Sequence, residues 1–407
     1  MSWVIHRLPN CSTRAATTSQ AARSQQAIRS RPRTRAPRGP EPSLPAKPLR
    51  RQPRVESAAD PLRIVALGGG TGLSTILRGL KRIAHGSFRE PRAAAAPFLD
   101  LGAVVTVSDD GGSSGRLRRA LDILATGDIR SCMVALAEDE ALLSRLFQYR
   151  FSTGRGLRGH SFGNLFLAAL AHVTGDFHQA IQLSSEVLAI HGHIFPSTLK
   201  NVQLVAEMAS GRTMVGESRI TGSPDAIRAV RLKPRRCPPV PDTLHAIEHA
   251  DLITLGPGSL YTSVIPNLLV EGIPEAIANS PACKVYLCNM MGQPGETVGY
   301  SASDHLRAIL QHSAVPVVDY VLLNNRRAPA ASRRRYAAQN AKPVSNDVAR
   351  LEKLGVKVLA LDLLGEGPQG RVRHDPERTA RVLVELARQG RAAKLRRMAR
   401  IPHPPSP

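Results

Sequence analysis

Four of five consecutive residues are glycine at the end of a short apolar run near the start of the chain. The stretch 64–80 reads IVALGGGTGLSTILRGL, in which 64–67 predicts a buried strand and the apolar spacing over 73–80 predicts a helix. A backbone without Cβ atoms lets a ligand approach closely, and the free N–H groups at a helix start favour an anion. We therefore predict a phosphate or diphosphate site at Gly69, Gly70, Thr71 and Gly72. The alternative is a tight turn that binds nothing.

The familiar nucleotide-binding patterns do not fit this turn. A Gly-x-Gly-x-x-Gly pattern starting at Gly68 or at Gly70 would have Leu73 or Thr75 in place of its third glycine, and the lysine of a P-loop is absent. Asp109 closes the next predicted strand and could bind a ribose, although it lies about 40 residues further on rather than about 20. A dinucleotide ligand therefore stays an alternative.

A pair of carboxylates opens the loop SDDGGSSGRLR after that next strand. Asp109 and Asp110, beside a phosphate turn, could hold Mg²⁺ together with phosphate oxygens, or bind a ribose hydroxyl. The alternative is that Asp110 and Ser114 only cap a turn and a helix. Ser113, Ser114 and Arg116 are further candidate ligand contacts in this loop.

Two more polar segments lie at predicted helix starts. In GDIRSC we expect Asp128 to cap the helix and Arg130 to have an anionic partner, because a cation in a first turn opposes the helix dipole. In GHSFGN we expect His160 and Asn164 to contact a ligand or to brace loops. This segment also fits Gly-x-Ser-x-Gly, but no strand precedes it as a nucleophile elbow requires, so a hydrolase with a nucleophilic Ser161 is disfavoured.

The pattern of the opening stretch recurs at 251–269, DLITLGPGSLYTSVIPNLL, as strand, glycine-rich turn and helix. The same helix-terminus physics predicts a second anion site, or the far end of the same diphosphate, at Gly258, Ser259, Tyr261 and Thr262. Asn289 follows the apolar run VYLC and is a further candidate ligand residue.

Strands and helices alternate from residue 64 onward, which predicts an α/β fold with a mostly parallel, Rossmann-like sheet and helices on both faces. The predicted strands are 64–67, 101–107, 252–255, 285–288, 320–323 and 356–361. Ligands of such sheets bind outside the carboxyl ends of the strands, so the candidate residues should converge on one crevice. Residues 325–347 are polar and irregular, and we interpret them as a surface loop.

The 407 residues carry a formal charge of +23, but the charge is concentrated at the two ends. Residues 1–60 are predicted to be a disordered basic extension, 61–390 the α/β domain, and 391–407 a basic tail that contains proline. Without interleaved aromatic residues these ends do not favour nucleic-acid binding. No apolar run approaches 18 residues, so no membrane span is expected, and five scattered cysteines without a C-x-x-C pair suit a reducing cytoplasm.

The ordered segments ALGGGTGLS, VTVSDDGGSSGRLR, GDIR, YRF, GHSFGN, FPSTL, LGPGSLYTS and CNMMGQPGET resemble the gluconeogenesis-factor (YvcK-like) family of bacteria. That family is homologous to the 2-phospho-L-lactate transferases (CofD) of deazaflavin coenzyme synthesis. The resemblance covers about residues 62–325 and implies a Rossmann-like core with a cleft for a nucleotide diphosphate.

In the gluconeogenesis-factor branch the implied ligand is a UDP-sugar. The implied role is a cytoplasmic regulator of cell shape and envelope supply during gluconeogenic growth rather than a proven enzyme, and the protein could form a homodimer. The first alternative is a Mg²⁺-dependent phospholactate transferase, with the metal near Asp109 and Asp110. The second alternative is an NAD(P)-binding oxidoreductase.

Overall fold

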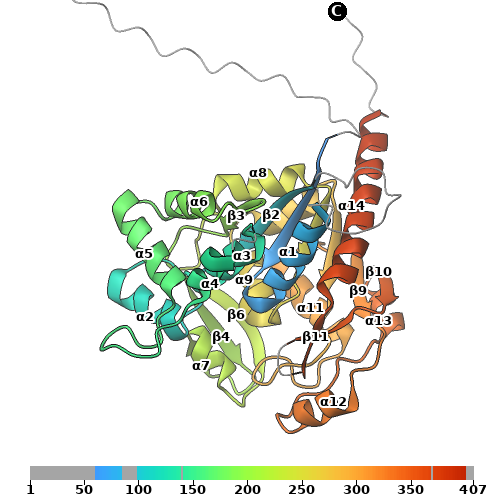
Figure 1. Ribbon diagram of the computed structural model, residues 1–407. Coiled ribbons are helices and arrows are strands. Elements are labelled where there is room, and N and C mark those ends of the chain that lie inside the picture. The colour runs from blue at the N-terminus through green and yellow to red at the C-terminus, as the bar shows by residue number, and fades with distance from the viewer. Residues whose placement is uncertain (1–59, 85–98, 139–140, 368–369, 400–407) are drawn as a thin grey trace, which may run out of the picture. The chain divides into compact units, whose positions relative to one another are not determined.

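A parallel sheet of seven strands forms the centre of the protein (Figure 1). The structure is a computed structural model that describes residues 60–84, 99–138, 141–367 and 370–399, so nearly all of the predicted disordered extension lies outside the described residues. The strand order is β10-β9-β8-β7-β1-β2-β3. The strands are β1 (Leu62–Gly68), β2 (Leu99–Val105), β3 (His193–Pro196), β7 (Leu252–Leu255), β8 (Cys283–Leu287), β9 (Tyr320–Asn324) and β10 (Lys357–Leu361).

The central strands are almost continuous runs of buried residues, as a sheet covered on both faces requires. β1 pairs in parallel with β2 on one side and with β7 on the other, which places Leu67 beside both Val104 and Leu255. The six strands predicted from apolar runs are all present, and the Rossmann-like α/β prediction is confirmed. β3 was not predicted, because HIFP is too short to show a pattern.

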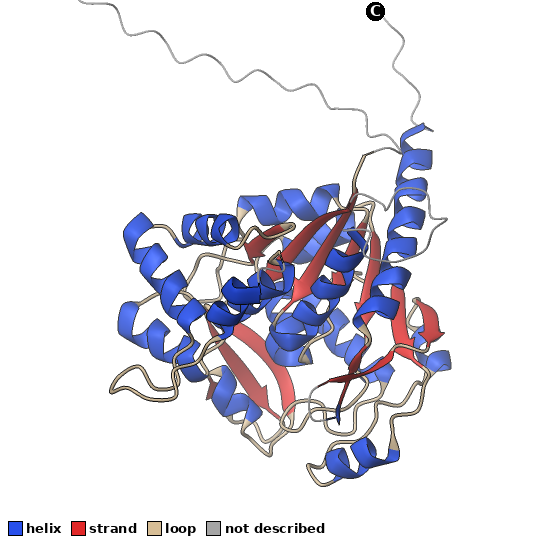
Figure 2. Ribbon diagram, in the orientation of Figure 1, coloured by secondary structure: helices blue, strands red, loops and turns tan. Residues whose placement is uncertain are grey.

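Helices cover both faces of the sheet (Figure 2). The helices α1 (Gly70–Ala84), α3 (Gly127–Leu136) and α14 (Pro376–Ala399) pack side by side on one face, whereas α8 (Pro241–His249) and α10 (Ile273–Asn279) lie on the other. Right-handed crossovers explain this division, because the chain moves from β1 to β3 in one direction and from β7 to β10 in the opposite one. The strand order therefore reverses between β1 and β7, although all the strands run parallel.

The remaining helices lie in the connections between these elements. They are α2 (Gly112–Leu121), α4 (Ala141–Gln148), α5 (Phe162–Thr174), α6 (Phe177–Val187), α7 (Glu217–Thr221), a π-helical turn (Leu260–Val264), α9 (Ile265–Leu268), α11 (Ala302–Ser313), α12 (Ala330–Ala337) and α13 (Val348–Lys353). α12 lies inside the segment 325–347, so the interpretation of that segment as a loop was incomplete. None of the helices in the described ranges has the length and apolar composition needed to cross a bilayer.

Two small antiparallel sheets were not predicted. One has the order β5-β4-β6, with β4 (Gln203–Met208), β5 (Thr213–Val215) and β6 (Ile227–Lys233). The other is the hairpin of β11 (Leu364–Gly367) and β12 (Arg371–His374). Their short, charge-containing strands do not show the buried runs that revealed the central sheet.

The α/β domain extends beyond the boundary predicted at residue 390. α14 continues to Ala399, and within it the guanidinium of Arg391 donates to both carboxylate oxygens of Asp251, at 2.7 and 2.5 Å. Arg391 is 4% exposed and Asp251 is fully buried. The first half of the predicted tail is therefore a packed helix, because its arginine neutralises a buried acid at the start of β7.

Candidate functional site

The two glycine-rich turns meet at the reversal point of the sheet. The GGGTG turn leaves β1 and the GPGS turn leaves β7, and these strands are neighbours. A Cβ atom at Gly72 would lie 2.3 Å from the carbonyl oxygen of Pro257, so only glycine fits where the two backbones approach. In open α/β sheets the crevice at such a reversal point is the usual ligand site.

Gly70 is the position where the first turn opens outward. It has φ +62°, a conformation that glycine adopts without strain, and it is the first residue of α1. A Cβ atom there would have only the Ser263 hydroxyl oxygen nearby, at 3.9 Å. The first N–H groups of a helix have no partner inside the helix, so this end of α1 can offer donors and the positive end of a dipole to an anion.

A cavity of about 630 Å³ lies in front of this turn. Its size suits a nucleotide-sized ligand. Of the predicted ligand residues, the following line it: Gly69, Gly70, Thr71, Gly72, Gly258, Ser259 and Asn289. Ser259 and Asn289 are joined through Gln293, whose side-chain nitrogen donates to the Ser259 hydroxyl at 2.9 Å and whose oxygen accepts from Asn289 at 3.3 Å.

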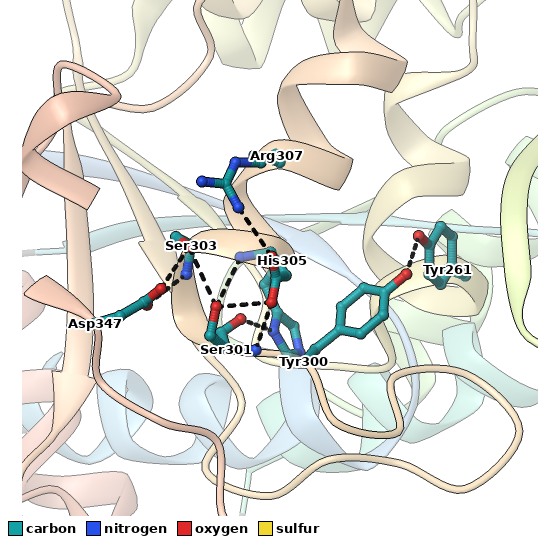
Figure 3. A network of polar contacts seen from close by, with 8 residues as sticks. Tyr261, Tyr300, Ser301, Ser303, His305, Arg307 and Asp347 are labelled. Carbon is teal, nitrogen blue, oxygen red and sulfur yellow. Dashed lines mark hydrogen bonds and ion pairs between the residues drawn. The ribbon is translucent and has the colours of Figure 1, made fainter. Parts of the chain in front are cut away.

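At the second turn a carboxylate of the protein lies at the helix start. The Glu296 carboxylate accepts the Tyr261 backbone N–H and the Thr262 hydroxyl, both at 3.1 Å. Burial raises the pKa of Glu296 to about 7. The Tyr261 hydroxyl meets that of Tyr300 at 2.9 Å (Figure 3). Neither Tyr261 nor Thr262 lines the cavity, and in this structure their donors serve Glu296. A ligand contact at these two residues stays a prediction.

Asp128 lies directly against the first turn. A Cβ atom at Gly69 would be 2.3 Å from an Asp128 carboxylate oxygen, and a hydrogen bond from the Gly70 backbone reaches the same side chain. Burial, and then the charge of Asp109, raise the pKa of Asp128 to about 7. Asp128 does not cap α3 as predicted, because the helix begins at Gly127 and Thr126 precedes it as the capping residue.

The two adjacent carboxylates of the SDDGG loop are directed to different partners. Asp109 accepts the Gly111 N–H at 2.8 Å, and Asp110 accepts both the backbone N–H and the hydroxyl of Ser218 at 2.9 Å. Burial raises the pKa of Asp109. In the described part of the chain no three acidic, His or Cys side chains are grouped to hold a metal ion. The pair therefore does not fit a metal site formed by protein ligands alone, and Mg²⁺ shared between Asp109 and ligand phosphates stays a prediction.

Glu217 is an acidic residue of this region that sequence reasoning did not find. It begins α7 after Gly216, and burial followed by the charges of Asp109 and Asp128 raises the pKa of Glu217 to about 9. Its acidic neighbours, Asp109, Asp128 and Glu296, come from distant segments of the chain, so no local pattern marks it. With a pKa of about 9, the Glu217 carboxyl group is uncharged at neutral pH.

The other predicted ligand residues form a brace of hydrogen bonds between loops rather than a cavity wall. The Ser113 hydroxyl meets His160 Nδ1 at 3.1 Å, and the Ser114 hydroxyl accepts the backbone N–H groups of Thr126 and Gly127. Arg116 donates to the Arg158 carbonyl, and Arg130 donates to the Asn164 side chain at 2.9 Å.

In this structure His160 and Asn164 hydrogen-bond to other loops, and none of the brace residues lines the cavity. Among the described residues Arg130 forms no ion pair with a carboxylate, and its guanidinium donates to Asn164. Ligand contacts at these residues stay predictions. The Ser161 hydroxyl donates to the Phe147 carbonyl at 3.2 Å, so it is hydrogen-bonded to the backbone rather than to a catalytic base.

The opposite wall of the cavity is basic and comes from the C-terminal part of the domain. It is lined by Arg335 and Tyr336 of α12, by Gln339 just after that helix, and by Arg371, Arg373 and His374 of β12. Sequence reasoning missed this wall because the segment of α12 was interpreted as a surface loop and β12 was not predicted. The run SRRRY is the one local signal, since an arginine cluster beside an aromatic residue is unusual in a purely solvated loop.

These features define a Rossmann-like α/β protein with a cavity in front of a glycine-rich turn. Residues 64–364 match the family described as 2-phospho-L-lactate transferase CofD. The gluconeogenesis factor of Bacillus subtilis (strain 168) is 44% identical over 327 residues, which cover 80% of this chain and 98% of that protein. The gluconeogenesis factor of Halalkalibacterium halodurans is 45% identical, over 79% of this chain and 95% of that protein.

A crystal structure of a Bacillus halodurans protein superimposes with a TM-score of 0.75 at 45% identity, covering 80% of this chain and all of that one. The chain therefore belongs to the CofD family, in the branch of the gluconeogenesis factors. The resemblance noted from the sequence motifs is confirmed.

Proposed function

We propose that the protein is a gluconeogenesis factor that binds a nucleotide diphosphate, a UDP-sugar, at the GGGTG turn. In this proposal it acts in the cytoplasm as a regulator that supports cell shape and envelope supply during gluconeogenic growth. The names of its relatives support the physiological part of the proposal.

The open turn at Gly70 is the observation that supports the ligand most directly. Its glycine has φ +62° and faces a cavity of about 630 Å³ at the reversal point of the sheet. A diphosphate placed there would accept N–H groups of the first turn of α1, and each hydrogen bond to a charged group contributes about 1.5–3 kcal/mol.

The second candidate is a phospholactate-type transferase, which the family description favours. Such an enzyme would move a phospholactate group from a nucleotide carrier to a deazaflavin hydroxyl. Against it, Asp110 is tied to Ser218 through two hydrogen bonds. Turnover with a deazaflavin acceptor and Mg²⁺ by the unmodified protein would favour this candidate over ours.

A thermal-shift panel tests the proposal. UDP-glucose, GDP, GTP and NAD(P) are each added with and without Mg²⁺, and a ligand at 100 times its Kd should stabilise the protein by about 2.7 kcal/mol. We expect UDP-glucose to raise the melting temperature. A shift with NAD(P) alone would contradict the proposal and favour an oxidoreductase.

A further inference from the structure

The helix α4 presents a second apolar face to solvent. Leu142 and Leu146 are 74% and 39% exposed, and Tyr149, just after the helix, is 50% exposed. These positions are four and three residues apart, so they share one face of the helix, which we call the α4 face. The helix packs through its other side, where the buried Phe147 contacts the ring of Phe166 of α5 at 5.1 Å between centroids. The α4 face is therefore not used to hold the helix on the domain.

A paired loop continues from the end of α4 toward α5. The Phe162 N–H donates to the Tyr149 carbonyl and the Phe151 N–H to the His160 carbonyl, both at 2.9 Å. Residues 152–158, which we call the loop tip, are all exposed, and the loop projects from the body of the domain (Figure 1). Leu157 in the loop tip is 44% exposed. The paired stem therefore holds a leucine outside the packed core.

The same segment is basic. Residues 141–175 contain four arginines and no acidic residue, and all four arginines are exposed: Arg145, Arg150, Arg155 and Arg158. No ion pair within the described ranges involves any of them, whereas Arg228 on β6 contacts Glu207 at 3.0 Å. Like charges grouped without counter-charges create a positive potential that attracts a polyanion.

The combination of leucines and arginines distinguishes between polyanions. A nucleic-acid backbone would engage the arginines but has no apolar layer for Leu142, Leu146 and Leu157. An anionic lipid bilayer offers both partners, because its headgroups attract guanidinium groups and its acyl boundary receives apolar side chains. An aromatic residue with a polar end, such as Tyr149, is also favourable at that boundary. A projecting tip suits a fluid surface that can deform around it.

We propose that the loop tip and the α4 face form a docking surface for an anionic lipid bilayer. Leu157 enters the headgroup layer, and Arg155 and Arg158 on either side of it bind lipid phosphates. The docking is peripheral, since none of the described helices can cross a bilayer. None of these residues lines the ligand cavity, so the inference does not depend on the proposed UDP-sugar.

Vesicle co-sedimentation of the full chain tests the arginines. The vesicles are phosphatidylcholine alone, or phosphatidylcholine mixed with an equal amount of the anionic phosphatidylglycerol. We expect Arg155→Gln/Arg158→Gln to bind the mixed vesicles roughly tenfold more weakly than the wild type. The control Arg235→Gln/Arg236→Gln removes the same two charges from exposed positions after β6. The basic ends of the chain are present in both double variants, so the difference between them measures the loop tip alone.

A fluorescent reporter tests the apolar part of the surface. Trp3 is the one tryptophan of the chain, so Leu157→Trp in a Trp3→Phe background gives emission from the loop tip only. We expect this emission to move to shorter wavelength with the mixed vesicles and to stay unchanged with phosphatidylcholine alone, because the indole enters the headgroup layer. The control is Leu361→Trp in the same background, at an exposed position of the edge strand β10, and it should show no change.

Three results would overturn the docking surface. The first is equal binding of the two double arginine variants to the mixed vesicles, and the second is an unchanged emission of Leu157→Trp with those vesicles. Duplex DNA, tested with the same double variants, supplies the third. If DNA distinguishes the two variants and the vesicles do not, the surface binds nucleic acid and the lipid proposal fails.

Discussion

The GGGTG turn after β1 and the GPGS turn after β7 have the same local design but different environments. Each joins a buried strand to a helical segment, and the two turns touch where Gly72 approaches Pro257. At the first turn the Asp128 carboxylate accepts a hydrogen bond from the Gly70 backbone, and at the second the Glu296 carboxylate accepts the donors of Tyr261 and Thr262. The two turns differ in the space around their glycines: a Cβ atom at Gly70 would meet only the Ser263 hydroxyl at 3.9 Å, whereas a Cβ atom at Gly258 would lie 3.2 Å from the Ser263 Cβ atom. A helix start thus predicts affinity for an anion, and the tertiary structure decides how much room is left for a ligand.

The largest expected effect is a loss of stability on removing Arg391, at the end of the sheet opposite the ligand cavity, and this loss should leave ligand binding unchanged. Arg391→Ala leaves the fully buried Asp251 carboxylate without its partner, which should cost about 3–5 kcal/mol of unfolding free energy. Asp251 lies at the amino end of β7, so ligand affinity of the folded fraction should stay unchanged.

Urea denaturation measures this loss, with Arg388→Ala as the matched control on the same helix. Arg388 forms an exposed pair with Glu385, and its removal should cost at most about 1 kcal/mol. An equally small loss for Arg391→Ala would mean that α14 does not stabilise the domain beyond residue 390.

Glu296→Gln should change how stability depends on pH. The pKa of Glu296 is raised from its ordinary value of 4.5 to about 7, so as pH rises the unfolded state ionises first. The folded state therefore loses stability between about pH 4.5 and 7, by a few kcal/mol, and the loss is complete above that range. Glutamine can still accept the Tyr261 N–H, so the variant should have a flatter stability profile over this range.

Denaturation at a series of pH values measures this difference. The exposed Glu248→Gln on α8 is the control and should leave the profile unchanged. If Glu296→Gln has the same profile as the wild type, then the second turn is not occupied by a carboxylate that titrates in this range.

Gly72→Ala tests whether the two turns depend on each other. The added Cβ atom would lie 2.3 Å from the carbonyl oxygen and 2.7 Å from the carbonyl carbon of Pro257. The Pro257 backbone cannot rotate out of the way as a flexible side chain can. The resulting shift should cost about 1–3 kcal/mol in thermal or urea unfolding. Thr71→Ala, in the same turn, introduces no such contact and should unfold nearly as the wild type does; equal behaviour of both variants would argue against the close packing of the turns.

The sequence was sufficient for the central fold because its strands are continuous buried runs. Ile64–Leu67 is apolar throughout and 252–255 is apolar except for the buried Thr254, and the glycine-rich turns that follow mark where each strand stops. β4, β5 and β6 were missed because half-exposed strands mix apolar and charged residues, as in IRAVRLK of β6.

The site was predicted only in part because its partners come from distant segments. The spacing of the glycines was enough to predict both turns. Glu296 and Glu217, in contrast, have raised pKa values because they are buried against segments that are distant in the chain, which no local pattern shows. Ser113, His160 and Asn164 show the converse case. Their polarity suggested ligand contacts, but they hydrogen-bond within the fold, which a sequence pattern alone does not reveal.

The most direct test of the central claim is calorimetry of Gly70→Val with UDP-glucose and with uridine. Valine resists φ +62° and would project into the cavity where the diphosphate is proposed to lie. We expect folded Gly70→Val to bind UDP-glucose tenfold to a hundredfold more weakly than the wild type, on the basis of one or more lost hydrogen bonds of about 1.5–3 kcal/mol. Uridine, which has no phosphate, should bind both proteins about equally. A folded Gly70→Val that binds UDP-glucose as tightly as the wild type would contradict the account, because the diphosphate would then lie away from the GGGTG turn.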